Sequence, residues 1–303
     1  MAKYANILVP VDFSESSDAS FAYALDLAEA HGATLHVLNV YHLPSYALPD
    51  GAFIPGPEAV AEILTAAKKE IDRHTAAAAA RGVKVDGKAS EGAVHEEVLR
   101  HAKAIKADLI VMGTHGRTGI TRWALGSVAE RVMRQAEAPV LAIKGKDAEP
   151  AHGDAAFPPV RIVVAHDLSE PAHRALDAAK SLRGDTKIPI DVVHVFLDPW
   201  ADYQTASTAF REQAEHRFEA YHAGLKTILD EQIGKVFGQD RAGVTVHLVR
   251  GRPVEALVEH VKKSGAGMIC MGSSGKDAVE RFLLGSVAQK LMQLSPSPVL
   301  VVH

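Results

Sequence analysis

The chain has 303 residues, 47% of them hydrophobic, and a formal net charge of −4, which fits one large domain or two ordinary ones with sizeable cores. Acidic and basic residues are mixed along it, which excludes a dedicated nucleic-acid surface of clustered Lys and Arg. Because no apolar run approaches the ~20 residues that span a bilayer, and the N-terminus shows no signal peptide, we expect a cytoplasmic protein that contacts no membrane.

Apolar strands and helices alternate along the first half. We expect five strands, at residues 7–11, 34–40, 83–89, 109–112 and 140–143. Ser14 is a suitable N-cap for the helix after the first strand. A long helix follows an irregular, Pro-rich stretch and covers residues 58–81, and another helix precedes the last strand at residues 127–136.

The second half repeats the first. Strands are expected at residues 162–165, 190–196, 244–249, 268–271 and 299–302. Ser169 takes the place of Ser14, and the later helices are expected at residues 206–235 and 286–294. Residues 146–159 have no periodicity and read as a linker between a first domain, 1–145, and a second, 160–303. The fold class is therefore α/β: two tandem, open, parallel five-stranded sheets with flanking helices, in a Rossmann-like arrangement.

A glycine-rich loop follows the fourth strand in each half. The spacing is Gly113-x2-Gly116-x9-Gly126-Ser127 in the first half and Gly272-x2-Gly275-x9-Gly285-Ser286 in the second. Ligands of open parallel sheets bind beyond the carboxyl ends of the strands. Glycines there permit positive φ and close approach, their N–H groups can form an anion nest, and the following helix N-terminus favours phosphate. A single such loop is commonly an ordinary turn, but its repetition favours a phosphate site in each half.

The sequence does not support two other nucleotide-binding motifs. Residues 82–89 resemble a Walker A loop but end in Ala89 rather than Ser or Thr, and they alternate like a strand. No Gly-x-Gly-x-x-Gly follows the first strand, so a dinucleotide dehydrogenase is unsupported.

These features resemble the universal stress protein family. The resemblance rests on residues 10–14 (Pro-Val-Asp-Phe-Ser), on the repeated glycine spacing and on the final strand at residues 139–143, and it covers nearly the whole chain outside the linker. It implies a tandem member of the family. The ATP-binding branch of that family uses this glycine motif, whereas another branch lacks the motif and does not bind ATP; both halves here keep it.

The resemblance also implies which residues contact ATP. It places adenine near Pro10, Asp12 and the backbone of Val40. It places the ribose and phosphates against Met112, Gly113, Gly116, Arg117, Gly126, Ser127 and Val128. The matching positions in the second half are Ala165, Asp167, Val195, Met271, Gly272, Gly275, Gly285, Ser286 and Val287. Ala165 replaces Pro10, and Ser274 and Lys276 replace His115 and Arg117, so the second site is expected to differ in affinity.

Asp12 and Asp167 allow two interpretations. A carboxylate at the carboxyl end of a strand can accept hydrogen bonds from a ribose hydroxyl or the adenine amine. It can equally serve the N-terminus of the next helix as a cap or favourable charge.

Three functions stay open at this point. The first is a non-enzymatic, stress-response regulatory protein whose adenine-nucleotide state alters an unknown protein partner. The second is a slow ATPase or phosphotransferase using the same sites, with Mg²⁺; near the loops only Asp12 and His115 suit such chemistry, and His115 has no equivalent in the second half. The third is metal binding by some of the sixteen histidines, for which His166 with His194, or His95 with His101, are the candidate pairs. No metal-ligand motif is present, so we expect no metal site.

The last strand of each half is short and apolar, at residues 140–143 and 299–302. Bare strand edges invite pairing, and the resemblance implies that such strands pair between domains. We therefore expect the two halves to pack as a pseudo-dimer within one chain, with a further homodimer left open.

Overall fold

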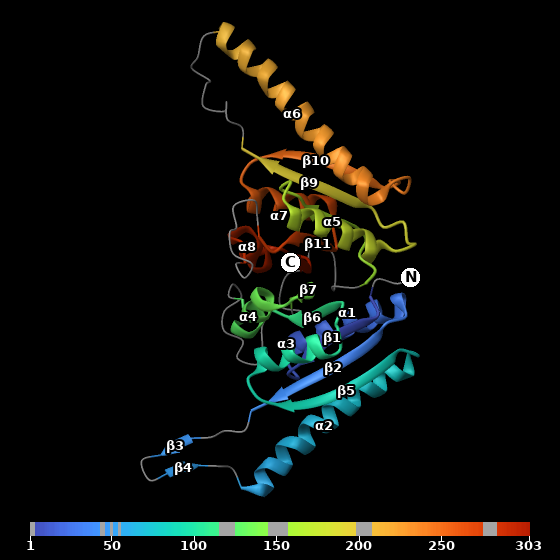
Figure 1. Ribbon diagram of the computed structural model, residues 1–303, viewed down its shortest axis with the longest axis vertical. Coiled ribbons are helices and arrows are strands. Elements are labelled where there is room, and N and C mark those ends of the chain that lie inside the picture. Colours follow the sequence, from blue (N-terminus) through green and yellow to red (C-terminus); the bar gives the residue numbers. More distant parts are fainter. Residues whose placement is uncertain are drawn as a thin grey trace.

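The computed structural model describes residues 4–42, 46–48, 51–53, 56–114, 125–144, 157–197, 208–274 and 284–303. Within these ranges helices and strands alternate in both halves (Figure 1). The expected linker, residues 146–159, lies mostly outside the described residues.

The first half contains five parallel strands, β1 (Asn6–Val11), β2 (Thr34–Tyr41), β5 (Lys84–Glu91), β6 (Leu109–Gly113) and β7 (Val140–Ile143). Their order in the sheet is β7-β6-β1-β2-β5. The helices are α1 (Glu15–His31), α2 (Pro57–Ala80), α3 (Val94–Ala104) and α4 (Ser127–Gln135). The stretch expected to be irregular contains a short antiparallel pair, β3 (Tyr46–Leu48) and β4 (Gly51–Phe53), which the sequence did not predict.

The second half repeats this arrangement with β8 (Ile162–Ala165), β9 (Ile190–Phe196), β10 (Val244–Arg250), β11 (Met268–Gly272) and β12 (Val299–Val302). The strand order is β10-β9-β8-β11-β12. The helices are α5 (Glu170–Arg183), α6 (Thr208–Phe237), α7 (Pro253–Ser264) and α8 (Ser286–Leu294). The rejected Walker-like segment forms β5, as its alternating pattern indicates.

Each face of the sheet carries its own hydrophobic core. One core joins the strands to α1, α2, α5 and α6, and the other joins them to α3, α4, α7 and α8. The central strands are buried on both faces, which explains why their sequences are continuously apolar. Ser14 and Ser169 cap α1 and α5 as expected, since each hydroxyl accepts a backbone N–H from the first helical turn.

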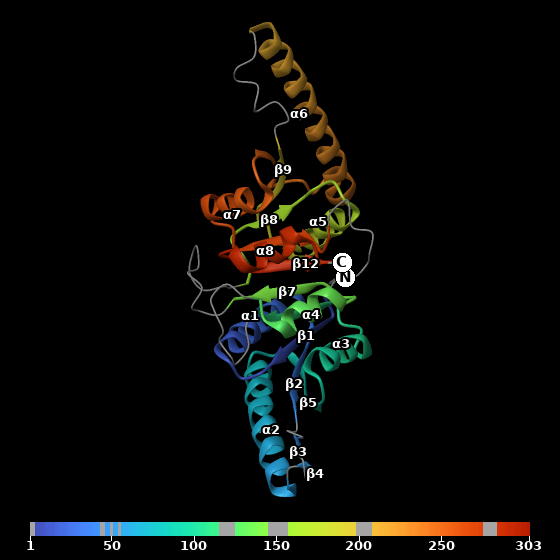
Figure 2. The ribbon, with the colours of Figure 1, turned by 90° about the vertical axis from the view of Figure 1, so that its left-hand side faces the viewer.

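The two half-sheets join into one. β7 pairs with β12 in the antiparallel sense, with Leu141 opposite Leu300, and these are the strands that the sequence predicts to pair. The result is a ten-stranded sheet in which this is the antiparallel junction (Figure 2). Lys144 crosses the junction: its Nζ donates to the carbonyls of Gln293 and Ser295, each at 2.7 Å, and so caps the end of α8.

We expect the two halves to stay associated when the linker is cut near Asp154. The strand pairing, the apolar side chains of β7 and β12 and the Lys144 contacts do not depend on a covalent connection. Complete cleavage at an engineered protease site, followed by size-exclusion chromatography, tests this. A single peak of unchanged volume is expected, and two peaks of half the mass would contradict it.

The helices α2 and α6 extend past opposite ends of the sheet (Figure 1). They are 24 and 30 residues long, and charged side chains recur along both. Among the helices in the described ranges, none is both long and apolar enough to cross a membrane.

Candidate functional site

A cavity of about 280 Å³ lies at the carboxyl ends of β8, β9 and β11, where the sequence predicted a ligand. Eight residues predicted for the second site line it: Ala165, Asp167, Val195, Met271, Gly272, Gly285, Ser286 and Val287. The ninth, Gly275, lies outside the described residues. The cavity therefore brings together segments that are more than a hundred residues apart in the sequence.

The sequence missed other lining residues. Pro253 and Leu257 come from the first turns of α7, and Val193 comes from β9. They add apolar surface to the lining. For Pro253 and Leu257, the sequence indicates only a helix that begins shortly after β10. It does not indicate that the start of this helix borders the cavity. His166, Ala172, Ser273, Ser274 and Ala288 complete the lining.

The ends of the glycine loop are fixed in the same way in both halves. The Gly126 N–H donates to the Thr114 carbonyl at 2.8 Å, and the Gly285 N–H donates to the Ser273 carbonyl at 2.7 Å. Each bond brings a helix N-terminus next to the end of the fourth strand of its half. Because helix geometry leaves the first N–H groups without an intrahelical acceptor, the donors that remain are those of the next three residues. In the second half these are Ser286, Val287 and Ala288, and all three line the cavity.

The glycines act differently from what the sequence suggested. Gly126 and Gly285 are the N-caps of α4 and α8, at φ −61° and −62°, in agreement with the predicted helix starts. Gly113, for which the sequence suggested a positive φ, does not have one, and neither does its counterpart Gly272. A side chain on Gly113 would overlap the Ser16 hydroxyl, and one on Gly272 would lie 2.6 Å from Pro171 Cβ. These two glycines are needed for close packing of the fourth strand against the first helix of each half.

Gly116 and Arg117 of the first loop lie outside the described residues, as does His115. The other positions predicted for the first site are Pro10, Asp12, Val40, Met112, Gly113, Gly126, Ser127 and Val128. The structure places them at the carboxyl ends of β1, β2 and β6 and at the start of α4, in the topology that forms the cavity of the second half. Met112 is buried, and Ser127 is exposed.

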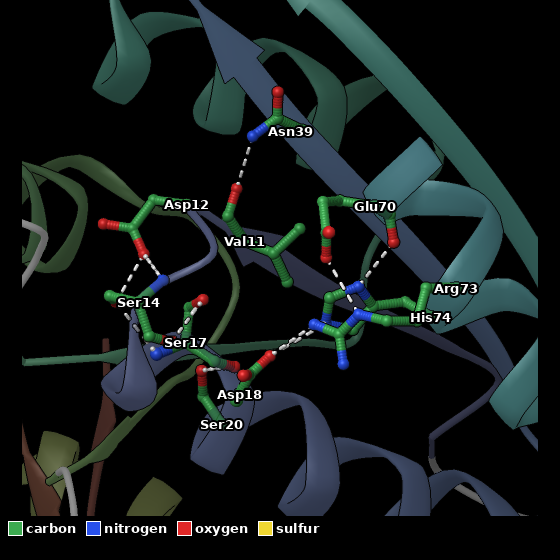
Figure 3. Close-up of polar contacts among 10 residues, drawn as sticks. All are labelled: Val11, Asp12, Ser14, Ser17, Asp18, Ser20, Asn39, Glu70, Arg73 and His74. Carbon is green, nitrogen blue, oxygen red and sulfur yellow. Dashed lines mark hydrogen bonds and ion pairs between the residues drawn. The ribbon is translucent and has the colours of Figure 1, made fainter. Parts of the chain in front are cut away.

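Asp12 and Asp167 each close a tight turn. Asp12 Oδ1 accepts the Ser14 N–H at 3.1 Å and the Ser14 hydroxyl at 2.5 Å (Figure 3). Asp167 makes the same pair of contacts with Ser169. The turn requires a left-handed residue between them, Phe13 at φ 65° and Leu168 at φ 67°. One carboxylate oxygen thus orders the helix N-terminus, while Asp167 also lines the cavity, so both sequence interpretations have structural support.

A side chain on the second strand of each half supports the end of the first strand. Asn39 Nδ2 donates to the Val11 carbonyl at 2.8 Å (Figure 3), and His194 Nδ1 donates to the His166 carbonyl at 2.6 Å. The carbonyl can only accept, so His194 carries its proton on Nδ1. The pair His166 and His194 therefore meets through a backbone carbonyl. Among the described residues, neither this pair nor His95 with His101 belongs to a group of three converging metal ligands.

Comparisons with known proteins agree with the internal repeat. The model of the universal stress protein family matches residues 3–144 and again residues 160–303. Universal stress protein MJ0531 of Methanocaldococcus jannaschii is 36% identical over 144 residues, which cover 46% of this chain and 82% of that protein. A universal stress protein of Mycolicibacterium smegmatis is 27% identical over 311 residues, covering 98% and 96%. The crystal structure of a universal stress protein from Archaeoglobus fulgidus shares the fold, with a TM-score of 0.71, 24% identity and coverage of 100% and 98%.

Proposed function

The chain belongs to the universal stress protein family, with two copies of the family domain in tandem, and we propose that each copy binds an adenine nucleotide such as ATP. The observation that carries the proposal is the second-half cavity. It joins an apolar cleft between strands to the open N-terminus of α8. A nucleotide has the same two parts, an apolar ring and an anionic tail.

The base fits the apolar end of this cavity. Val193, Val195 and Leu257 face it from β9 and α7. Its volume, about 280 Å³, is just below the usual range for small-molecule pockets, roughly 300–1,000 Å³, which suits a base with its ribose while the phosphates lie outside it. The phosphates then extend along the glycine loop.

Among the described residues of the second site, the donors available to the phosphates are backbone N–H groups. Ser286, Val287 and Ala288 line the cavity, and their N–H groups have no acceptor within the helix. The helix dipole adds a partial positive charge there. Small residues flank this end, Gly272, Ser273 and Ser274, so phosphate oxygens can approach the backbone closely.

The chemistry favours binding over turnover. Phosphoryl transfer needs a carboxylate to hold Mg²⁺ and a group to position the nucleophile. Among the described residues, Asp167 is the carboxylate that lines the cavity, and one of its oxygens already accepts two hydrogen bonds. We therefore propose a regulatory protein whose nucleotide state is read by a protein partner.

Two measurements test the proposal. Mass spectrometry of small molecules released from the denatured, purified chain should detect an adenine nucleotide, and calorimetry on the stripped chain should detect ATP binding. A single-turnover assay with and without Mg²⁺ should show negligible hydrolysis over the time of binding. Absence of binding would overturn the proposal, and rapid Mg²⁺-dependent turnover would replace regulation with catalysis.

The two sites are expected to differ in affinity. Arg117 and Arg122 give the first loop a charge of +2, whereas the second loop has balanced charges from Lys276, Asp277, Glu280 and Arg281. These six residues lie outside the described ranges, so the argument rests on their charges alone. At ~0.2–1 kcal/mol per exposed charge contact, two charges favour the first site by about 0.4–2 kcal/mol, or roughly 2-fold to 30-fold.

Single variants measure this difference. The Gly285→Asp chain keeps the first site and should bind ATP more tightly than the Gly126→Asp chain. The gap should narrow in high salt because exposed charges are screened. The opposite order of affinity would contradict the charge argument.

A further inference from the structure

Three potential metal ligands converge at the outer edge of the second half-sheet, away from the nucleotide cavity. Asp191 lies on β9, His247 on β10 and His260 on α7. One ligand atom from each lies within 4.8 Å of the others. Asp191 Oδ2 is 3.0 Å from His260 Nε2, and Asp191 Oδ1 is 3.5 Å from His247 Nε2.

These separations match metal coordination. Ligand atoms about 2.0–2.1 Å from a tetrahedral Zn²⁺ lie roughly 3.3 Å from one another. The two carboxylate-to-imidazole distances, 3.0 Å to Oδ2 and 3.5 Å to Oδ1, are close to that value. The two imidazole rings lie close together, with centroids 4.7 Å apart and planes tilted by 59°, and the Nε2 atom of each is near the Asp191 carboxylate.

One of the three side chains is buried, and the other two are partly exposed to solvent. The Asp191 side chain is only 3% exposed, whereas those of His260 and His247 are 16% and 35% exposed. The two histidines therefore form the partly exposed side of the group. His247 Nε2 is itself buried and forms no hydrogen bond.

We propose that Asp191, His247 and His260 bind one divalent transition-metal ion of the Zn²⁺ class. Two imidazoles and a carboxylate suit Zn²⁺ far better than Mg²⁺ or Ca²⁺, which prefer oxygen ligands. Water completes the coordination on the exposed side. None of the three residues lines the nucleotide cavity.

Arg161 limits the affinity. Its Nη1 contacts Asp191 Oδ1 at 2.6 Å and already neutralises the carboxylate. A metal ion adds positive charge beside this guanidinium, so the two cations oppose each other. Removing Arg161 should therefore tighten metal binding. A structural ion-pair network without metal predicts no such gain.

The first half provides a matched control. Asn6 occupies the position of Arg161, and His101 that of His260, but His36 replaces Asp191 and Lys88 replaces His247. Among the described residues, this cluster does not form a three-ligand group. The ring centroids of His36 and His101 are 6.3 Å apart.

The test uses the full chain after dialysis against a chelator. Zn²⁺ titration by calorimetry should give one tight site, and a bound ion should raise the thermal midpoint because it ties α7 to β9 and β10. His260→Gln should weaken Zn²⁺ at least about 100-fold, and Arg161→Asn should strengthen it about 10-fold. His101→Gln, the first-half control, should change neither the Zn²⁺ affinity nor the rise in thermal midpoint that Zn²⁺ produces.

X-ray absorption of the Zn²⁺-loaded parent needs no variant, so its result does not depend on whether the variants fold. It should show two imidazoles and oxygen ligands. Absence of a tight site in the parent, a spectrum with no paired imidazoles, or equal affinities for the parent and a folded His260→Gln chain would overturn the proposal. If the Arg161→Asn chain binds Zn²⁺ no more tightly than the parent, the three residues belong to a structural ion-pair network instead.

Discussion

A chain carrying both Gly126→Asp and Gly285→Asp is expected to lose ATP binding while staying folded. Both glycines are N-caps in extended backbone, at ψ 141° and 148°, a conformation that any residue adopts. Asp is a better N-cap than Gly, and its charge favours a helix N-terminus. The substitution therefore costs the fold nothing and even adds a few tenths of a kcal/mol.

The same carboxylate opposes the phosphates. It would stand at the N-terminus where we place the anionic tail, and it would also compete for the helix N–H groups that line the cavity. Two unit charges about 4 Å apart near a protein surface repel by ~4 kcal/mol. Each site should thus weaken by at least about 100-fold. Calorimetry with ATP measures the loss, and circular dichroism and the thermal midpoint confirm the fold.

Asn provides the control for this prediction. It has the same shape as Asp and caps helices equally well, but it is neutral. The chain with Gly126→Asn and Gly285→Asn should bind ATP much more tightly than the Asp chain. Equal loss in both would show that side-chain bulk matters rather than charge. Unchanged binding in the Asp chain would place the phosphates elsewhere.

Much of the fold could be predicted because the local signals agree with one another. Two predicted elements match the structure residue for residue, the strand at residues 162–165 and the helix at residues 286–294. A β-branched run marks the strand, and a Gly-Ser pair marks the start of the helix. The pair of β3 and β4 was missed because its segments are only three residues long and flanked by turn-forming residues. Strands this short carry too little periodicity to be recognised.

The cavity of the second half lies where the sequence predicted a ligand, but the packing role of its glycines was not predicted. Spacing located Gly272 and Gly285, but only the packing shows that Gly272 is needed for the approach of α5. Pro253 and Leu257 could not be assigned, because a helix face acquires its neighbour through the tertiary fold. The cluster of Asp191, His247 and His260 was missed for the same reason: its members are far apart in the sequence and follow no ligand spacing.

The second large effect is expected from Gly272→Ala, which should destabilise the chain by about 2–3 kcal/mol. The new Cβ would lie 2.6 Å from Pro171 Cβ, 2.8 Å from the Pro171 carbonyl carbon and 3.0 Å from the Ala172 nitrogen. Two of these atoms are backbone at the start of α5, so the helix itself must move. The thermal midpoint, followed by circular dichroism, should fall by roughly 4–8 °C.

The equivalent change in the first half should cost less. Ala at position 113 would collide mainly with the Ser16 hydroxyl, while the other near atoms lie 3.2 Å away. A hydroxyl can rotate away or be removed, so Gly113→Ala combined with Ser16→Ala should recover most of the loss. Gly272→Ala combined with Pro171→Ala should not recover, because the backbone contacts persist. If both pairs recover equally, side chains rather than backbone set the approach, and the two glycines are retained for the ligand and not for packing.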